Sequence, residues 1–356
     1  MVATPSTALA SVSTSPDVTD KVAGGVYGMD HANGRTFIGG LFTRVGGKAR
    51  TNVAAIGANG LVDATFSPNV NGRVRAVAAS EDGSVIYLGG TFSEVAGAPR
   101  ANLAAVDAVT GAVIAGWQAD TSGVAPDVAS LAVEGKRLYV GGRFTGIDGT
   151  TRKRLVAIDT VTGDLIPSFK PTPNKGVTEV VVAPDGVVYA GGAFTMLGGQ
   201  PRLAAGSVDR ATGSATTFSP TGSGGNAVTI GLSPDGARFF YGTENNTLFA
   251  YDPATSNNPV WSLKTSGNTQ AIAVSDDEMW IGGHFSQIVT GKVPRSFIAS
   301  IDPVNGAVSD WDPETVGGKM GVWALELEGT HLHVGGLFSG FADVAQRGYA
   351  RFSQVQ

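Results

Sequence analysis

A short motif, Gly-Gly-x-Phe or a remnant of it, recurs seven times along this chain of 356 residues. Neighbouring copies begin 40 to 53 residues apart, a spacing typical of repeat architectures. The fifth copy is degenerate and reads Gly-Thr-Glu-Asn. The recurrence predicts a tandem array of one supersecondary unit rather than a series of unrelated domains. The copies begin at Gly39, Gly89, Gly141, Gly191, Gly242, Gly282 and Gly335.

The second copy shows most clearly what one unit contains. It has four apolar runs, VRAVAASEDG, SVIYLGGTF, ANLAAVDAVTG and AVIAGWQAD, each bounded by Gly- and Asp-containing turns. The runs have the length and composition of β-strands, and helical periodicity is absent from the chain. Four antiparallel strands per unit, repeated radially, predict an all-β, seven-bladed β-propeller that forms a single domain over residues 1–356.

The repeated polar residues have structural explanations. An Asp ends the third strand of most units and precedes a Thr-Gly or Asn-Gly turn, where its carboxylate is expected to accept hydrogen bonds from turn amides. An Arg recurs in the loop between the second and third strands, and we expect its guanidinium group to bind nearby carbonyl or carboxylate oxygens. These arginines are Arg50, Arg100, Arg152, Arg202, Arg295 and Arg347.

The two ends of the chain complement each other. The seventh unit supplies three strands and the chain then stops at Gln356, whereas residues 13–18 align with residues 65–70, an outer strand followed by its turn. We therefore expect residues from about 10 to 16 to form the outermost strand of the seventh blade and to cover its edge.

Composition excludes several classes of function. The net charge is −5, and no cluster of basic residues offers a surface for nucleic acid or anionic membrane. No apolar run is long enough to span a bilayer, and the first residues lack the features of a signal peptide. Because the chain has no cysteine, disulfides and thiolate metal sites are excluded.

The first unit, GGLFTRVGGKARTNVAAIGANGLVDATFSPNVNGRVRAVA, resembles the bacterial delta-sixty repeat family. Later units end in D-x-x-T-G, as in AVDAVTGAVIAGW, which is similar to the tryptophan-docking repeat of quinoproteins. These resemblances imply a propeller found at the cell surface or outside bacteria, with no established activity. A quinone cofactor is not predicted, since the chain lacks the adjacent cysteine pair of many quinoprotein dehydrogenases, and no other cofactor is predicted.

A binding site is expected where the sevenfold pattern is broken. The fifth unit has lost eight residues of loop together with its Phe and its Arg, which predicts a notch in the rim of one face. The variable residue of Gly-Gly-x-Phe is polar in the third, fifth and sixth units and is expected near the channel mouth. These positions give Arg143, Glu244 and His284 as candidate ligand-binding residues, and the loop that enters the seventh unit adds Lys319 and Trp323.

Two further groups contain possible metal ligands, but no metal is predicted at either. Asp120 and Asp127 bracket a proline-containing loop, but capping of backbone groups or solvation explains them better. His331 and His333 point to the same side of a predicted strand, yet the sequence identifies no third ligand for a metal.

No nucleophile motif, zinc-protease motif or phosphate loop is present. We therefore expect a non-catalytic extracellular binding or scaffold module that recognises a glycan, peptide or protein on one face and is a monomer unless it is part of an assembly. One alternative is a polysaccharide lyase or hydrolase, in which His284 is the general acid or base and Arg143 neutralises a substrate carboxylate, with Glu244 beside them. Another is a component of a phage or secretion assembly.

Overall fold

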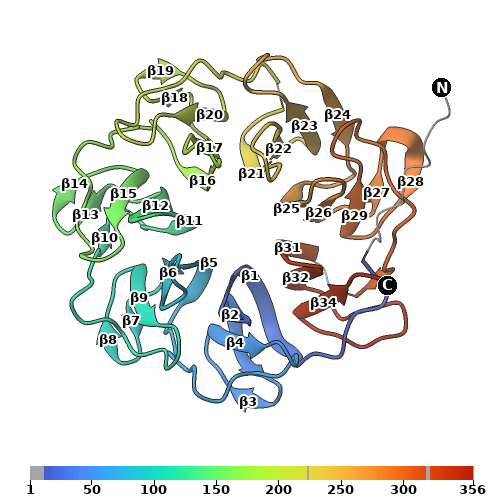
Figure 1. Ribbon diagram of the computed structural model, residues 1–356, viewed down its shortest axis with the longest axis horizontal. Coiled ribbons are helices and arrows are strands. Elements are labelled where there is room, and N and C mark those ends of the chain that lie inside the picture. Colours follow the sequence, from blue (N-terminus) through green and yellow to red (C-terminus); the bar gives the residue numbers. More distant parts are fainter. Residues whose placement is uncertain (1–11, 223, 318–320, 356) are drawn as a thin grey trace.

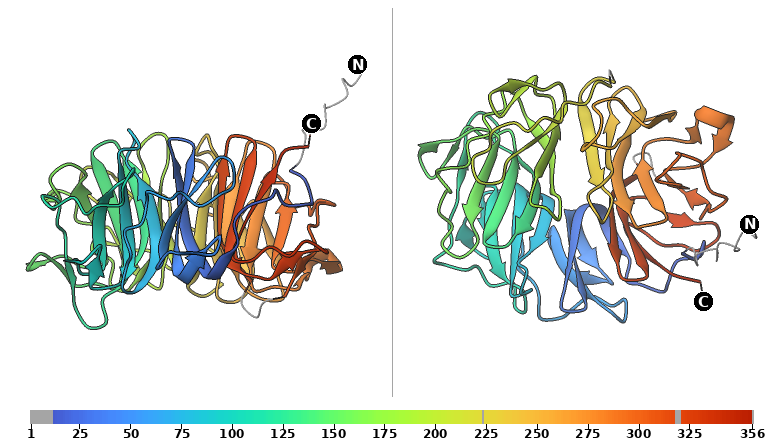
Figure 2. Two further views of the ribbon diagram at one scale, coloured as in Figure 1. Left: turned by 90° about the horizontal axis from the view of Figure 1, so that it is seen from below. Right: turned by 45° about the horizontal axis from the view of Figure 1, so that its top comes forward.

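The computed structural model describes residues 12–222, 224–317 and 321–355. The regular secondary structure of the described chain is antiparallel β-sheet, apart from one 3-10 turn at Thr290–Lys292 (η1). The sheets stand in a ring around a central channel and together form a flat disk (Figures 1 and 2). The innermost strand of each sheet contacts that of the next, and the last of these strands contacts the first. In the described chain, no helix has the length and apolar character needed to cross a membrane.

Within the described residues, seven sheets hold the longer strands. The first strands, which surround the channel, are β1 (Val22–Ala32), β5 (Arg73–Ala79), β11 (Val128–Glu134), β16 (Val177–Val182), β21 (Ala227–Leu232), β25 (Thr269–Val274) and β31 (Gly321–Glu328). The second strands are β2 (Arg35–Val45), β6 (Val85–Thr91), β12 (Arg137–Gly142), β17 (Val188–Gly192), β22 (Phe239–Thr243), β26 (Met279–Gly283) and β32 (His331–Leu337). The third strands are β4 (Val53–Gly57), β9 (Leu103–Asp107), β15 (Leu155–Asp159), β20 (Ala205–Val208), β23 (Thr247–Tyr251), β29 (Ile298–Ile301) and β34 (Tyr349–Ser353).

Two-residue strands lie in the loops outside these sheets and pair mainly with one another. They are β3 (Lys48–Ala49), β7 (Glu94–Val95), β8 (Ala98–Pro99), β10 (Thr121–Ser122), β13 (Gly146–Ile147), β14 (Thr150–Thr151), β18 (Met196–Leu197), β19 (Gln200–Pro201), β27 (Gln287–Ile288), β28 (Val293–Pro294), β30 (Thr315–Val316) and β33 (Gly340–Phe341).

The paired glycines of the motif permit two close approaches. A Cβ on Gly89 would lie 2.4 Å from Cγ1 of Val128, which belongs to the first strand of the next sheet. A Cβ on Gly90 would lie 2.0 Å from the carbonyl oxygen of Arg73 in its own sheet. The first glycine thus allows neighbouring sheets to pack, and the second allows the first strand to approach its partner. The expectation that these glycines serve packing is confirmed.

The Asp turns also have the expected geometry. The carboxylate of Asp107 accepts hydrogen bonds from the backbone N–H groups of Val109 and Thr110, and Gly111 has a φ of 76°. Hydrogen bonds from Thr110 lower the pKa of Asp107. The same arrangement recurs at Asp159, Asp209 and Asp302.

The fourth strands differ from the prediction. Among the described residues, only the fifth sheet has a regular fourth strand, β24 (Trp261–Lys264). In five other sheets the outer segment makes one isolated bridge, such as Val106 to Val113. In several of these sheets the repeated Arg binds the outer segment: Arg202 donates to the carbonyl oxygens of Phe218 and Thr216, and Arg50 to those of Asp63 and Ala64. In the third sheet Arg152 donates instead to the carbonyl oxygen of Thr151, and the outer segment there also makes one bridge.

The N-terminal segment lies along β34, the third strand of the last sheet. Val12 forms an antiparallel bridge with Gln354, and the N–H of Ser13 donates to the carbonyl oxygen of Ser353 over 2.8 Å. Residues 10 and 11 of the predicted strand lie outside the described residues. From residue 12 onward the segment makes a single bridge rather than a strand, because the chain turns at Ser13–Ser15 and Pro16 has no N–H to donate.

Candidate functional site

The candidate site is the central channel, which has a volume of about 1100 Å³. A β-bulge recurs in all seven first strands, between the residues paired with the first two positions of the motif, which are both glycine except for Thr243 in the fifth copy. The bulge leaves one residue unpaired in each strand, and each of these residues lines the channel. They are Tyr27, Arg75, Ala129, Thr178, Val228, Gln270 and Trp323.

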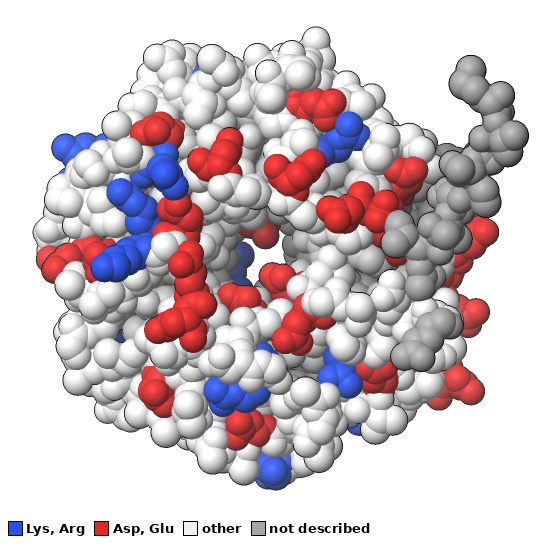
Figure 3. Space-filling model, viewed as in Figure 1, with Lys and Arg blue, Asp and Glu red and all other residues white. Residues whose placement is uncertain are grey.

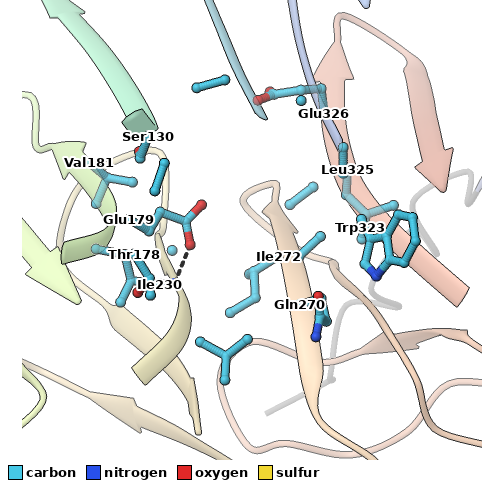
Figure 4. A pocket seen from close by; sticks show the side chains of 18 of the residues that line it. Ser130, Thr178, Glu179, Val181, Ile230, Gln270, Ile272, Trp323, Leu325 and Glu326 are labelled. Carbon is cyan, nitrogen blue, oxygen red and sulfur yellow. Dashed lines mark hydrogen bonds between the residues drawn. The ribbon is translucent and has the colours of Figure 1, made fainter. Parts of the chain in front are cut away.

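Three ring side chains from neighbouring sheets form a row on the channel wall, which we call the aromatic row: Tyr27, Trp323 and His284. The ring centroids of Tyr27 and Trp323 are 4.7 Å apart and their planes are inclined by 34°. The His284 ring lies 6.2 Å from that of Trp323, in an edge-on arrangement. Arg73 continues the row, with its guanidinium carbon 5.3 Å from the Tyr27 centroid. Trp323 is seen in Figure 4 beside Gln270.

Amide side chains fix the orientation of His284. Its Nδ1 lies 2.9 Å from Oδ1 of Asn268 and 3.1 Å from Nε2 of Gln270. An amide oxygen can only accept a hydrogen bond, so the contact with Asn268 requires the His284 tautomer that carries its hydrogen on Nδ1. Burial lowers the pKa of His284, which favours the neutral imidazole at pH 7.

The structure places some of the predicted ligand-binding residues in the channel wall and one of them outside it. Glu244 and His284 both line the channel, as does Trp323, and Glu244 accepts a hydrogen bond of 2.9 Å from Asn226. Arg143 is not among the lining residues. Its guanidinium lies 3.6 Å from the carboxylate of Asp127. Lys319 lies outside the described residues.

Asp127 and Asp120 each have their own partners. Asp127 is buried and also pairs with Arg75, a lining residue, so that two arginines share one carboxylate. Asp120 accepts hydrogen bonds from the backbone N–H of Ala101 and from Gln118. The carboxylates of Asp127 and Asp120 thus bind different partners and, within the described residues, do not share one.

Carboxylates also line the deeper channel. Oε2 of Glu179 accepts a hydrogen bond of 2.6 Å from the backbone N–H of Ile230 in the next sheet, and burial raises the pKa of Glu179 to about 7. Burial raises the pKa of Glu326 well above its ordinary range, and the nearby Asp30 adds to this effect. Figure 4 shows Glu179 and Glu326 on opposite walls of the channel. Figure 3 shows further acidic side chains around the central hollow on one face of the disk.

Sequence reasoning did not identify Tyr27 or Glu326 as channel residues. An alignment of the repeats could have identified Tyr27. In every first strand a Val, Ala or Thr precedes the bulge position, whereas the residue at the bulge position itself varies from Ala to Trp. Glu326 occupies the same strand position as Asp30, since each pairs opposite the residue two before the glycine pair. No comparable signal marks an acidic residue at that position.

Comparisons with known proteins support the fold. A family model described as a domain of unknown function (DUF5122) beta-propeller matches residues 31–66. A chain in the crystal structure of a mitotic checkpoint complex is similar over all of this chain and 95% of its own length, at 14% identity and a TM-score of 0.66. The computationally designed Ika8 protein is similar over 95% of this chain and 98% of its own, at 14% identity and a TM-score of 0.59. No curated protein matches. These findings support a β-propeller fold.

Proposed function

We propose that this chain is one seven-bladed β-propeller domain, of the delta-sixty repeat type, that binds a glycan at the channel wall without catalysing a reaction. The seven sheets are its blades, and the N-terminal segment beside β34 is the closure of the ring. A location at the surface or outside of a bacterial cell follows from the resemblance of the first repeat and stays a prediction.

The aromatic row is the observation that carries the proposal. Tyr27 and Trp323 are only partly buried and present ring surface to a channel wide enough for a small ligand. Polar groups flank the rings: Gln270 and Asn268 on one side, and the Glu244 carboxylate nearby in the lining. Sugar rings present one apolar face of C–H groups and a rim of hydroxyl groups, which suits aromatic rings flanked by amides and a carboxylate.

The geometry gives less support to the enzymatic alternative. Arg143, which that mechanism needs beside the substrate, lies against Asp127, and His284 is held by Asn268 through its Nδ1. Glu179 has a raised pKa but makes a backbone hydrogen bond to the next blade, which is a structural use of its carboxylate.

The experiment is a binding measurement with a panel of neutral and uronic-acid oligosaccharides, followed by tryptophan fluorescence and calorimetry. We expect Trp323→Ala to weaken binding of a recognised oligosaccharide about tenfold or more, because the stacked ring is lost. The matched control is Leu337→Ala, a partly exposed residue at the end of the neighbouring strand β32 in the same sheet.

Three results would count against the proposal. Equal affinity in Trp323→Ala and wild type would place the ligand elsewhere. Binding of peptides but of no oligosaccharide would replace the glycan by a protein partner. Turnover of an oligosaccharide that disappears in His284→Ala would show that the site is catalytic.

A further inference from the structure

A second cluster lies between the first and last sheets, at the other end of their strands from the aromatic row. His31 is near the end of β1, and Glu328 and His333 flank the turn that joins β31 to β32. Nδ1 of His31 lies 3.5 Å from Oε2 of Glu328, and Nε2 of His333 lies 3.6 Å from the same oxygen. One ligand atom from each of the three residues lies within 4.8 Å of the others. Figure 1 shows β1 and β31–β32 side by side.

Within the described chain, three of the four histidine nitrogens in this cluster lack a hydrogen-bond partner. Among the described residues, both ring nitrogens of His31 and Nε2 of His333 are buried without a hydrogen-bond partner. The His333 residue is 1% exposed. Buried polar atoms are rarely left unpaired, because each costs about 1–3 kcal/mol. Two of these three atoms, Nδ1 of His31 and Nε2 of His333, lie beside one carboxylate and therefore require an explanation.

The other ring nitrogen of His333 is held in place. Its Nδ1 lies 2.8 Å from the hydroxyl of Tyr349 and 3.3 Å from that of Thr36, both in the surrounding strands. Contacts of this kind fix the ring orientation of histidines that bind metals through the opposite nitrogen. Nε2 of His333 is thereby directed at Glu328.

We propose that His31, His333 and Glu328 bind a zinc ion that joins the first sheet to the last. Two imidazoles and a carboxylate form a donor set that suits zinc, at ligand distances of roughly 2.0–2.2 Å. Tetrahedral angles at these distances place ligand atoms roughly 3.3–3.6 Å apart, close to the two nitrogen–oxygen distances observed. Water completes the coordination.

The proposed ion acts at the seam where the ring closes. Strand β1 follows the N-terminal segment, whereas β31 and β32 belong to the last sheet, so the ion links residues from the two ends of the chain. A bound ion stabilises the folded state, by an amount that grows with the logarithm of the free ion concentration above its Kd, because the unfolded chain does not assemble the three ligands. The site is separate from the aromatic row and goes beyond the proposed function.

The test uses the full chain, freed of metal by dialysis against a chelator and then titrated with zinc chloride alone. We expect one zinc ion per chain, a rise in melting temperature on zinc addition, and intense visible absorption when cobalt(II) replaces zinc. Glu328→Gln should weaken zinc binding about 100-fold or more, and Tyr349→Phe about 10- to 100-fold, since it releases the second nitrogen of His333. His284→Ala, in the channel, is the control and should bind zinc as the wild type does.

Two outcomes would overturn the proposal. One is the absence of stoichiometric zinc binding by a wild-type protein that is shown to be folded by circular dichroism. The other is a Glu328→Gln variant that is equally folded and binds zinc as tightly as the wild type.

Discussion

The hydrogen bonds of Asp17 provide a direct test of how the two ends of the chain are held together. The Asp17 carboxylate accepts from Nε of Arg351 over 2.6 Å and from the hydroxyl of Ser353 over 2.7 Å, and both partners lie in β34. The Asp17 and Arg351 side chains are 22% and 17% exposed, so solvent screens this ion pair only in part. Asp17→Asn removes the charge and replaces one acceptor oxygen by an amide group.

The expected loss in the free energy of unfolding is about 2 kcal/mol, the usual value for a hydrogen bond to a charged group. Arg351 retains its hydrogen bond to the carbonyl oxygen of Ala58, which limits the loss. With an unfolding entropy of about 2.1 cal/mol/K per residue, a chain of this length should melt about 3 °C lower. Urea unfolding followed by tryptophan fluorescence measures the difference, and Trp311, whose Nε1 donates to the Ser13 carbonyl oxygen, reports on this region.

Asp310→Asn is the matched control, because Asp310 is exposed and the same charge is removed. If the two variants unfold at the same urea concentration, the contacts of Asp17 with β34 do not stabilise the fold and the reasoning is refuted. A Ser353→Ala variant should lose part of the same energy. Combined with Asp17→Asn, it should cost less than the sum of the single changes.

Two further changes test the packing between blades and the channel. Gly89→Ala should lower the free energy of unfolding by about 1–3 kcal/mol, because the new methyl group overlaps Val128. The control is Gly116→Ala, where a Cβ meets nothing within 4 Å, and it should change the free energy of unfolding by less than about 0.5 kcal/mol. Equal urea midpoints for the two variants would contradict this expectation. Glu179 has its pKa raised from 4.5 to about 7, so between these values the folded state keeps a proton that the unfolded state has released, and stability falls as the pH rises through this window. Glu179→Gln should reduce this pH-dependent loss of stability by up to about 3 kcal/mol, and by less where channel water screens the carboxylate. Urea unfolding curves at pH 5 and pH 8 measure the loss for each protein. If the variant loses as much stability between these pH values as the wild type, the reasoning is refuted.

The local features of the repeat could be predicted because their causes lie within a few residues. Asp107 is followed by Thr-Gly, and turn chemistry alone indicated that its carboxylate would accept the turn amides. The paired glycines indicated a close approach of backbone or side chain, as found at Gly89 and Gly90. The recurring Arg was expected to bind carbonyls, as Arg202 does.

The outer strands show where local reasoning was incomplete. Each outer run has strand composition, but in several sheets its carbonyl oxygens accept hydrogen bonds from the arginine in the preceding loop. The guanidinium of Arg202 donates to the carbonyl oxygens of Thr216 and Phe218, and the outer segment there makes a single bridge. The composition of the run does not reveal these contacts.

By itself, the sequence determined the repeat unit, its turns and the close packing at its glycines, because these depend on sterics and hydrogen bonds between near neighbours in the chain. Only the tertiary structure placed Arg143 against Asp127, Tyr27 against Trp323, and His31 beside His333 and Glu328. Such contacts join different sheets, and they depend on the strand bulges and on the angle between adjacent sheets. That angle is set by the packing of the whole ring, which brings the first and last sheets together.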